Sequence, residues 1–216
     1  MAILVGISGP SGSGKSRSLL NMDWDKTFII RCGKKPLPFK NKLKEWDSAT
    51  KTGNFIYSND YAFIRAVISK LPEYGFRSII IDDSTFLMTD SFMRLIGDKG
   101  YDKFNSMAND YYSLIKTAEA LPDNIRVYLV THTEETINGD LKMKTVGKLL
   151  DNVIDIPTLF TITLGAVKTK DHYKFRTQNS GRDFFKSPEG LFDSEFIDND
   201  LHQVDLAIKD YYGLED

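Results

Sequence analysis

A glycine-rich segment near the start of the chain has residue types and spacing that suit phosphate chemistry. Residues 9–16 read GPSGSGKS and match the pattern G-x-x-x-x-G-K-[ST]. Glycines let the backbone fold tightly, so that successive N–H groups face phosphate oxygens. Lys15 would bring a positive charge to the terminal phosphates, and the Ser16 hydroxyl would bind Mg²⁺. The pattern predicts a site for ATP or GTP, formed by Gly9, Pro10, Ser11, Gly12, Ser13, Gly14, Lys15, Ser16 and Arg17.

Two aspartates follow an apolar strand candidate further along the chain. Residues 79–81 are all isoleucine, and Asp82 and Asp83 come directly after them. Proteins with this kind of glycine loop usually hold magnesium with a second group, an aspartate at the end of a neighbouring apolar strand. We expect Asp82 to be that ligand. In the absence of the glycine loop, both aspartates would be equally consistent with capping the helix that follows.

The group that would orient or deprotonate an attacking water is less clearly marked. No glutamate follows Asp82, and Asp83 is the favoured carboxylate. Asp60, which comes after another expected strand, is its rival, and either residue could instead cap a helix. His132 ends a further strand candidate. It is equally consistent with a sensor of the terminal phosphate and with an ordinary polar residue at a strand end.

The elements expected around these residues alternate between strands and helices. Strands are predicted over residues 2–7, 27–32, 54–57, 76–81 and 127–130, and helices from the glycine loop to about 22 and over 60–71, 84–96, 102–120 and 200–212. This alternation predicts a mostly parallel sheet flanked by helices, in one α/β domain over residues 1–216. Residues 159–167 and 173–177 predict an antiparallel hairpin, so that hairpin and closing helix occupy about 159–212.

Two lysine-rich segments lack a periodic apolar pattern. Residues 33–53 predict an exposed excursion, and residues 133–148 predict a polar loop. The net charge of the whole chain is −2 and its pI is about 6.0, so a nucleic-acid partner would have to be held by a local patch. The single cysteine, Cys32, excludes an intramolecular disulfide and a cysteine-based metal cluster, and we expect a buried thiol. No apolar stretch is long enough for a membrane span, and we expect a cytoplasmic protein without a membrane partner.

Several segments together resemble the phage-encoded RecA-like ATPases that act in single-strand annealing or recombination. The resemblance is carried by residues 9–18, 79–88, 130–132, 144–149, 160–164, 173–177 and 186–188. It implies a RecA-like P-loop core that binds ATP and Mg²⁺ and assembles into a ring or filament on single-stranded DNA in the host cytoplasm. It also implies a function in pairing complementary strands during phage recombination or replication.

The resemblance assigns two further sets of residues. Lys142, Lys144 and Lys148 would lie near DNA, although a solvated lysine loop explains them equally well. Arg182 is the first choice for a basic residue that reaches the nucleotide of a neighbouring subunit. Tyr173 alternates with basic residues and would present a stacking surface to bases or form an ordinary half-buried strand. The chain lacks the catalytic glutamate and the N-terminal oligomerisation domain of recombinases, so strand exchange is not expected.

Two other functions stay open at this point. The sequence of the glycine loop is also common in nucleoside and nucleotide kinases. A small kinase is expected to have an arginine-bearing lid over the phosphates, but residues 133–148 contain no arginine. The missing glutamate would suit a nucleotide switch that binds ATP without hydrolysing it. A base-reading motif typical of GTPases is not found.

Overall fold

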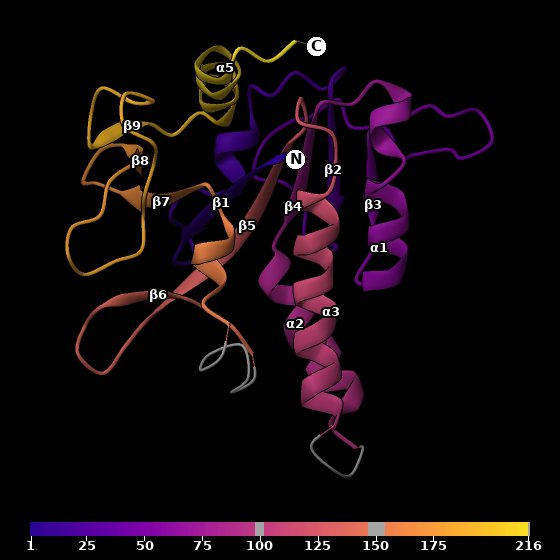
Figure 1. Ribbon diagram of the computed structural model, residues 1–216, viewed down its shortest axis with the longest axis horizontal. Coiled ribbons are helices and arrows are strands. Elements are labelled where there is room, and N and C mark those ends of the chain that lie inside the picture. Colours follow the sequence, from indigo (N-terminus) through magenta and orange to yellow (C-terminus); the bar gives the residue numbers. More distant parts are fainter. Residues whose placement is uncertain (98–101, 147–153, 216) are drawn as a thin grey trace.

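A nine-stranded sheet forms the centre of the computed structural model, which describes residues 1–97, 102–146 and 154–215 (Figure 1). The strands are β1 Ile3–Gly9, β2 Thr27–Arg31, β3 Phe55–Tyr57, β4 Ser78–Asp82, β5 Arg126–Glu135, β6 Leu141–Met143, β7 Ile162–Lys168, β8 Tyr173–Arg176 and β9 Phe196–Asp198. Their order is β3-β2-β4-β5-β1-β7-β8-β9, with β6 paired to β5. Pairing is parallel from β3 to β7 and antiparallel for β7–β8, β8–β9 and β5–β6. The predicted mostly parallel sheet with an antiparallel C-terminal hairpin is confirmed.

Helices cover both faces of this sheet. The α-helices are α1 Tyr61–Ile68, α2 Ser84–Leu95, α3 Asp102–Glu119 and α5 Leu201–Tyr212, and the 3-10 helices are η1 Ser16–Leu19, η2 Leu71–Tyr74 and η3 Ile156–Leu159. Side chains of α1, α2 and α3 share one hydrophobic cluster with one face of the central strands, while η1 and α5 share a second cluster with the other face. Figure 1 shows α1, α2 and α3 together and α5 apart from them. The central strands are therefore buried on both sides, which explains their continuous apolar sequences.

The strand order brings the candidate site residues to one edge of the sheet. Strand β5, which carries His132, lies between β1 and β4 and so separates the strand before the glycine loop from the strand that ends in Asp82. In the parallel registers Gly9 lies beside His132, and Arg31 lies beside Asp82. Because the carboxyl ends of parallel strands meet at the same edge, residues far apart in sequence converge there.

The helix predicted after the glycine loop is wrong in length. Only η1, a single 3-10 turn, follows Lys15, and turns occupy the residues up to Thr27. The backbone N–H groups of Leu20 and Met22 donate only three residues back, to Arg17 O at 3.1 Å and Leu19 O at 3.2 Å. Beyond them, Asp23 Oδ1 accepts a hydrogen bond from the backbone N–H of Asp25 at 3.1 Å. Aspartate and asparagine side chains compete with helical hydrogen bonds in this way.

The polar loop predicted for residues 133–148 is also partly wrong. Strand β5 continues to Glu135 and turns back into β6 through Asn138-Gly139, where Gly139 has a φ of +81°. The backbone N–H of Gly139 donates to Thr136 O at 2.9 Å. Asn-Gly is a strong hairpin signal, but the strands beside it are too polar to be recognised by their apolar pattern. Strand β9 was likewise not predicted.

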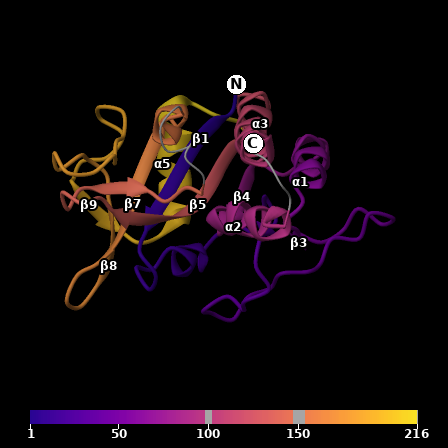
Figure 2. The same ribbon diagram turned by 90° about the horizontal axis from the view of Figure 1, so that it is seen from below.

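The excursion predicted after β2 is irregular, as expected. Residues 33–53 contain only the isolated bridges Glu45 to Phe55 and Asp47 to Thr52, which close its far end. Figure 2 shows this segment extending away from the sheet beside β3. In the described ranges, no helix has both the length and the apolar character needed to cross a membrane.

Candidate nucleotide-binding site

The glycine loop between β1 and η1 has a conformation that only small residues accept. Gly14 has a φ of +97°, and a Cβ placed on it would lie 2.6 Å from Cδ1 of Tyr173. Gly9 has no room either, because a Cβ there would lie 2.5 Å from the carbonyl oxygen of Ala166. The glycines of the motif are therefore required by backbone geometry and by close packing against β7 and β8.

Lys15 is folded back onto its own loop. Its ammonium group donates to Gly9 O at 2.7 Å and to Pro10 O at 2.8 Å, and it lies 3.4 Å from His132 Nδ1. The residue is only 8% exposed, and burial lowers the pKa of its side chain to about 8. A buried cation held by two carbonyl oxygens lacks a full anionic partner, and a phosphate group would supply one.

The hydroxyl of Ser16 and the carboxylate of Asp82 meet at the carboxyl ends of β1 and β4. Ser16 Oγ donates to Asp82 Oδ1 at 3.3 Å. Hydroxyl and carboxylate oxygens are the hard ligands that Mg²⁺ prefers, usually with phosphate oxygens and water completing its shell. The residues present thus fit the expected pair of magnesium ligands.

Asp82 lies in a strongly perturbed environment. Burial and the neighbouring Asp83 raise the pKa of its carboxyl to about 6, while Arg31 and Lys15 oppose this rise. A buried carboxylate beside a second carboxylate gains most from a cation, because both desolvation and repulsion are then offset. This arrangement favours a bound divalent cation over a role in capping α2.

Asp83 faces His132. The Oδ1 atom of Asp83 lies 3.4 Å from His132 Nε2, and this contact lowers the pKa of the Asp83 carboxyl. Asp83 has a left-handed backbone, with φ +62° and ψ +47°, and its side chain makes no cap to α2. Non-glycine residues in that region cost about 1–3 kcal/mol, and such strain clusters at functional sites.

A cavity of about 500 Å³ joins these residues into one site. Besides the loop and the two aspartates, its wall includes His132 and three residues that the sequence did not assign to it: Arg31, Lys35 and Tyr173. Its size lies within the range of small-molecule sites. One feature of the sequence could have placed Arg31 in the site, because it lies at the end of a predicted parallel strand, as Asp82 does. Lys35 had none beyond its charge.

Tyr173 lies against the glycine loop, although its alternation with basic residues is also consistent with a surface for DNA bases. Its ring packs on Gly14, with the guanidinium of Arg17 and the ammonium of Lys168 each 5.6 Å from the ring centroid. Phe175 is fully buried in the core. Of the two alternatives, β8 therefore matches the half-buried strand, and Tyr173 belongs to the cavity.

Asp60 is not brought to the cavity. It is exposed and accepts a hydrogen bond from the backbone N–H of Phe63 at 2.9 Å, which makes it the N-cap of α1. Its proposed role as the rival catalytic carboxylate is therefore corrected, because a carboxylate bound to a helix terminus is unavailable to a water elsewhere.

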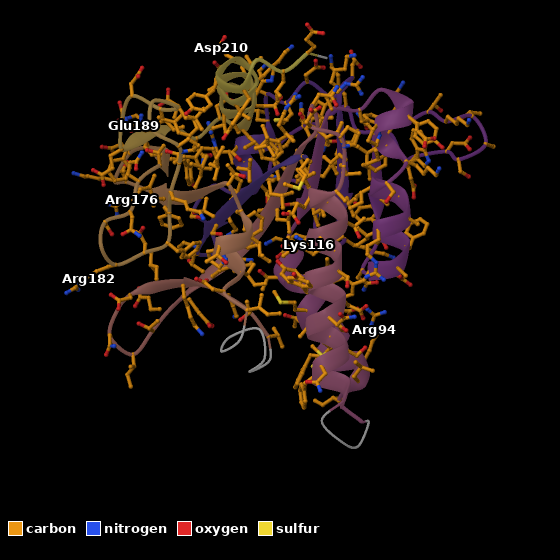
Figure 3. The ribbon with its side chains drawn as sticks, in the orientation of Figure 1. Arg94, Lys116, Arg176, Arg182, Glu189 and Asp210 are labelled. Atoms are coloured by element: carbon orange, nitrogen blue, oxygen red, sulfur yellow. The ribbon has the colours of Figure 1, made fainter. Side chains whose placement is uncertain are left out.

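Arg182 lies far from the glycine loop of its own chain and projects outward (Figure 3). With Lys142 it lines a separate cavity of about 390 Å³. Arg176, on β8, is held within its chain by Asp183 at 3.5 Å and by Glu195. Of these two arginines, only Arg182 is exposed.

The three lysines expected near DNA have different surroundings. Lys142, on β6, pairs with Glu134 at 3.0 Å, whereas the side chain of Lys144 is exposed. The backbone N–H of Lys144 donates to His132 O at 2.8 Å, so the hairpin is joined directly to the cavity. Lys148 lies outside the described residues.

Comparisons with known proteins find similarity to solved structures and no match in sequence. No protein-family profile and no curated protein sequence matches the chain. The chain is similar to a solved structure of the P4 protein from bacteriophage phi6 in complex with ADP, with a TM-score of 0.42 and 16% sequence identity. The match covers 81% of this chain and 55% of that one, so the chain spans about half the length of the phage protein. The interpretation of the site therefore rests on its own geometry.

Proposed function

We propose that the chain binds ATP with Mg²⁺ and hydrolyses it. The observation that carries this proposal is the 3.3 Å contact between Ser16 Oγ and Asp82 Oδ1, beside a buried Lys15 and a glycine loop. Magnesium bound there would neutralise charge on the phosphate oxygens. Lys15 would exchange its two carbonyl partners for phosphate oxygens, and the loop N–H groups would hold the phosphate chain.

Asp83 and His132 would act on the attacking water. In hydrolysis the water oxygen forms a bond to the terminal phosphorus, the bond from that phosphorus to the bridging oxygen breaks, and the water proton passes to Asp83. His132 would orient the Asp83 carboxylate through their 3.4 Å contact. The left-handed backbone of Asp83 supports this role, because it turns the carboxylate away from the start of α2.

The finer proposal names single-stranded DNA as the partner, with self-association on it. It is supported by the resemblance to phage recombination ATPases and by the hairpin of β5 and β6, where Lys144 is exposed and hydrogen-bonded to His132. A strand held at Lys144 would act on His132 through that backbone contact.

The experiment measures phosphate release by purified protein with and without an unlabelled oligonucleotide at low salt. We expect Mg²⁺-dependent release that single-stranded DNA stimulates, together with an increase in particle size when ATP and DNA are both present. Release that DNA does not change, together with no binding of a labelled oligonucleotide, would refute the DNA partner and leave the ATPase proposal standing.

A kinase is the second candidate, favoured by the shape of the cavity. Beyond the glycine loop the cavity continues to an apolar wall of Pro36, Leu37, Pro38, Phe39 and Leu20, which could hold an acceptor molecule. Incubation with labelled ATP and a panel of nucleosides and nucleotides, followed by chromatography, separates the two functions. A phosphorylated product in place of free phosphate would favour the kinase.

A further inference from the structure

Arg31 is a buried arginine whose hydrogen bonds are incomplete. It ends β2 and is 6% exposed. Its Nη1 donates to the hydroxyl of Tyr57 at 2.5 Å, and its Nη2 donates to the carbonyl oxygen of Lys35. Its Nε is buried and has no hydrogen-bond partner within the described ranges. A buried guanidinium with an unused donor is costly unless a ligand or a charge compensates it.

The contact between Arg31 and the carbonyl of Lys35 holds the first residues of the 33–53 excursion beside the end of β2. As a result Lys35 lines the same cavity as Lys15 and Asp83. Burial is the main cause of the lowered pKa of Lys15, and the contact with His132 is the main cause of the lowered pKa of Asp83; the charge of Lys35 adds a smaller decrease to each. The adjacent Lys34 is also exposed but does not line this cavity.

The charges around the cavity favour an anion. Its cationic side chains are Lys15, Arg17, Arg31 and Lys35, and its anionic side chains are Asp82 and Asp83, so four positive charges face two negative ones. Asp82 is already assigned to a cation in the proposed function. The excess of positive charge on the Arg31 side is therefore available to a phosphate group.

We propose that Lys35 binds the terminal phosphate of the bound nucleoside triphosphate from within the same chain, and that Arg31 is the positioning residue that holds it there. The inference rests on the proposed function and names how the site recognises a triphosphate. Lys35 would then supply, from the same chain, the positive charge that was expected from a basic residue of a neighbouring subunit, such as Arg182.

The test compares the affinity of Mg²⁺-bound ADP with that of a non-hydrolysable ATP analogue by calorimetry. Lys35→Ala should weaken analogue binding by about tenfold or more, because a charge-assisted hydrogen bond is lost, while ADP affinity stays within about twofold. Lys35→Arg should retain the preference for the analogue. Lys34→Ala is the matched control and should behave as the wild type.

Arg31→Lys tests the positioning role, because it keeps the charge but cannot donate to Tyr57 and Lys35 together. We expect it to lower the ratio of analogue affinity to ADP affinity, as Lys35→Ala does. The variant that combines Arg31→Lys with Lys35→Ala should lower this ratio no further than either single substitution. Denaturant midpoints check that each variant folds. An unchanged ratio in Arg31→Lys would overturn the positioning role.

The outcomes separate the inference from the proposed function. If Lys35→Ala leaves the ratio unchanged, or weakens ADP and the analogue equally, Lys35 does not bind the terminal phosphate, although the chain still binds nucleotide. If the wild-type protein binds neither ligand, both the proposed function and the inference are refuted.

Discussion

The carboxylate of Asp83, directly after β4, and the imidazole of His132, within the adjacent parallel strand β5, face each other at 3.4 Å. Asp83 reaches this position through a left-handed backbone, directly after the buried Asp82. Two consecutive aspartates therefore face different partners, Ser16 for the first and His132 for the second. In the proposed function, Asp82 would bind the metal and Asp83 would take up the proton of the attacking water.

Asp83→Asn should abolish most turnover without preventing nucleotide binding. Asparagine accepts the left-handed backbone, so the variant removes the charge with little added strain. We expect phosphate release to fall by about 100-fold or more, as for loss of a general base. Steady-state phosphate release and calorimetric binding of ADP measure the two effects. Asp60→Asn is the control and should keep full turnover; the reverse pattern would assign catalysis to Asp60.

Lys15→Ala should remove productive nucleotide binding, because it deletes the cation that faces the terminal phosphates. Unchanged ATP affinity in a binding measurement on this variant would contradict the placement of the site.

Asp82→Asn should instead reduce Mg²⁺-dependent turnover more than nucleotide affinity, since it removes one metal ligand and leaves the glycine loop intact. Binding is measured with and without Mg²⁺. Equal loss of turnover and of nucleotide affinity in Asp82→Asn would indicate a folding defect.

A buried ion pair on the opposite side of the molecule should control stability. Arg126, 2% exposed, donates to Asp205 Oδ1 and Oδ2 at 2.9 Å each, so that α5 is held to the sheet. Asp205→Ala removes the carboxylate that neutralises this buried guanidinium and should lower the free energy of unfolding by about 3–5 kcal/mol. Urea unfolding provides the measurement.

The matched control for that ion pair is the exposed pair of Lys70 and Glu73, whose nitrogen and oxygen are 3.2 Å apart. Lys70→Ala should change the free energy of unfolding by less than about 1 kcal/mol, because solvent screens exposed charges. Similar losses in Asp205→Ala and Lys70→Ala would show that burial does not decide the strength of these pairs.

Cys32 should be unreactive in the folded protein. It is 5% exposed, and burial, with a smaller contribution from Asp82, raises the pKa of its thiol well above the usual value. The reactive thiolate is therefore scarce at pH 8, and reagent cannot reach it. A colorimetric thiol assay should detect one thiol in denaturant and almost none without it. Rapid labelling of native protein would show that the end of β2 opens to solvent.

The sequence by itself determined the sheet and the phosphate loop, because these features depend on local patterns. The isoleucines before Asp82 predict a strand buried on both faces, and the spacing of Gly14, Lys15 and Ser16 permits few other structures. Element ends were less predictable. The helix expected after the glycine loop is only the 3-10 turn Ser16–Leu19, and the polar residues of β6 were not recognised as a strand.

Only the tertiary structure decided which polar residues share the site. Asp60 and Asp83 have equivalent sequence positions, each after a strand, but the carboxylate of Asp60 binds the N-terminus of α1 while that of Asp83 faces His132. Arg31, Lys35 and Tyr173 enter the cavity through strand order and register, which join residues distant in sequence. A local pattern carries the preference of a segment for helix or strand, whereas the contacts of a long polar side chain depend on which strands the fold makes neighbours.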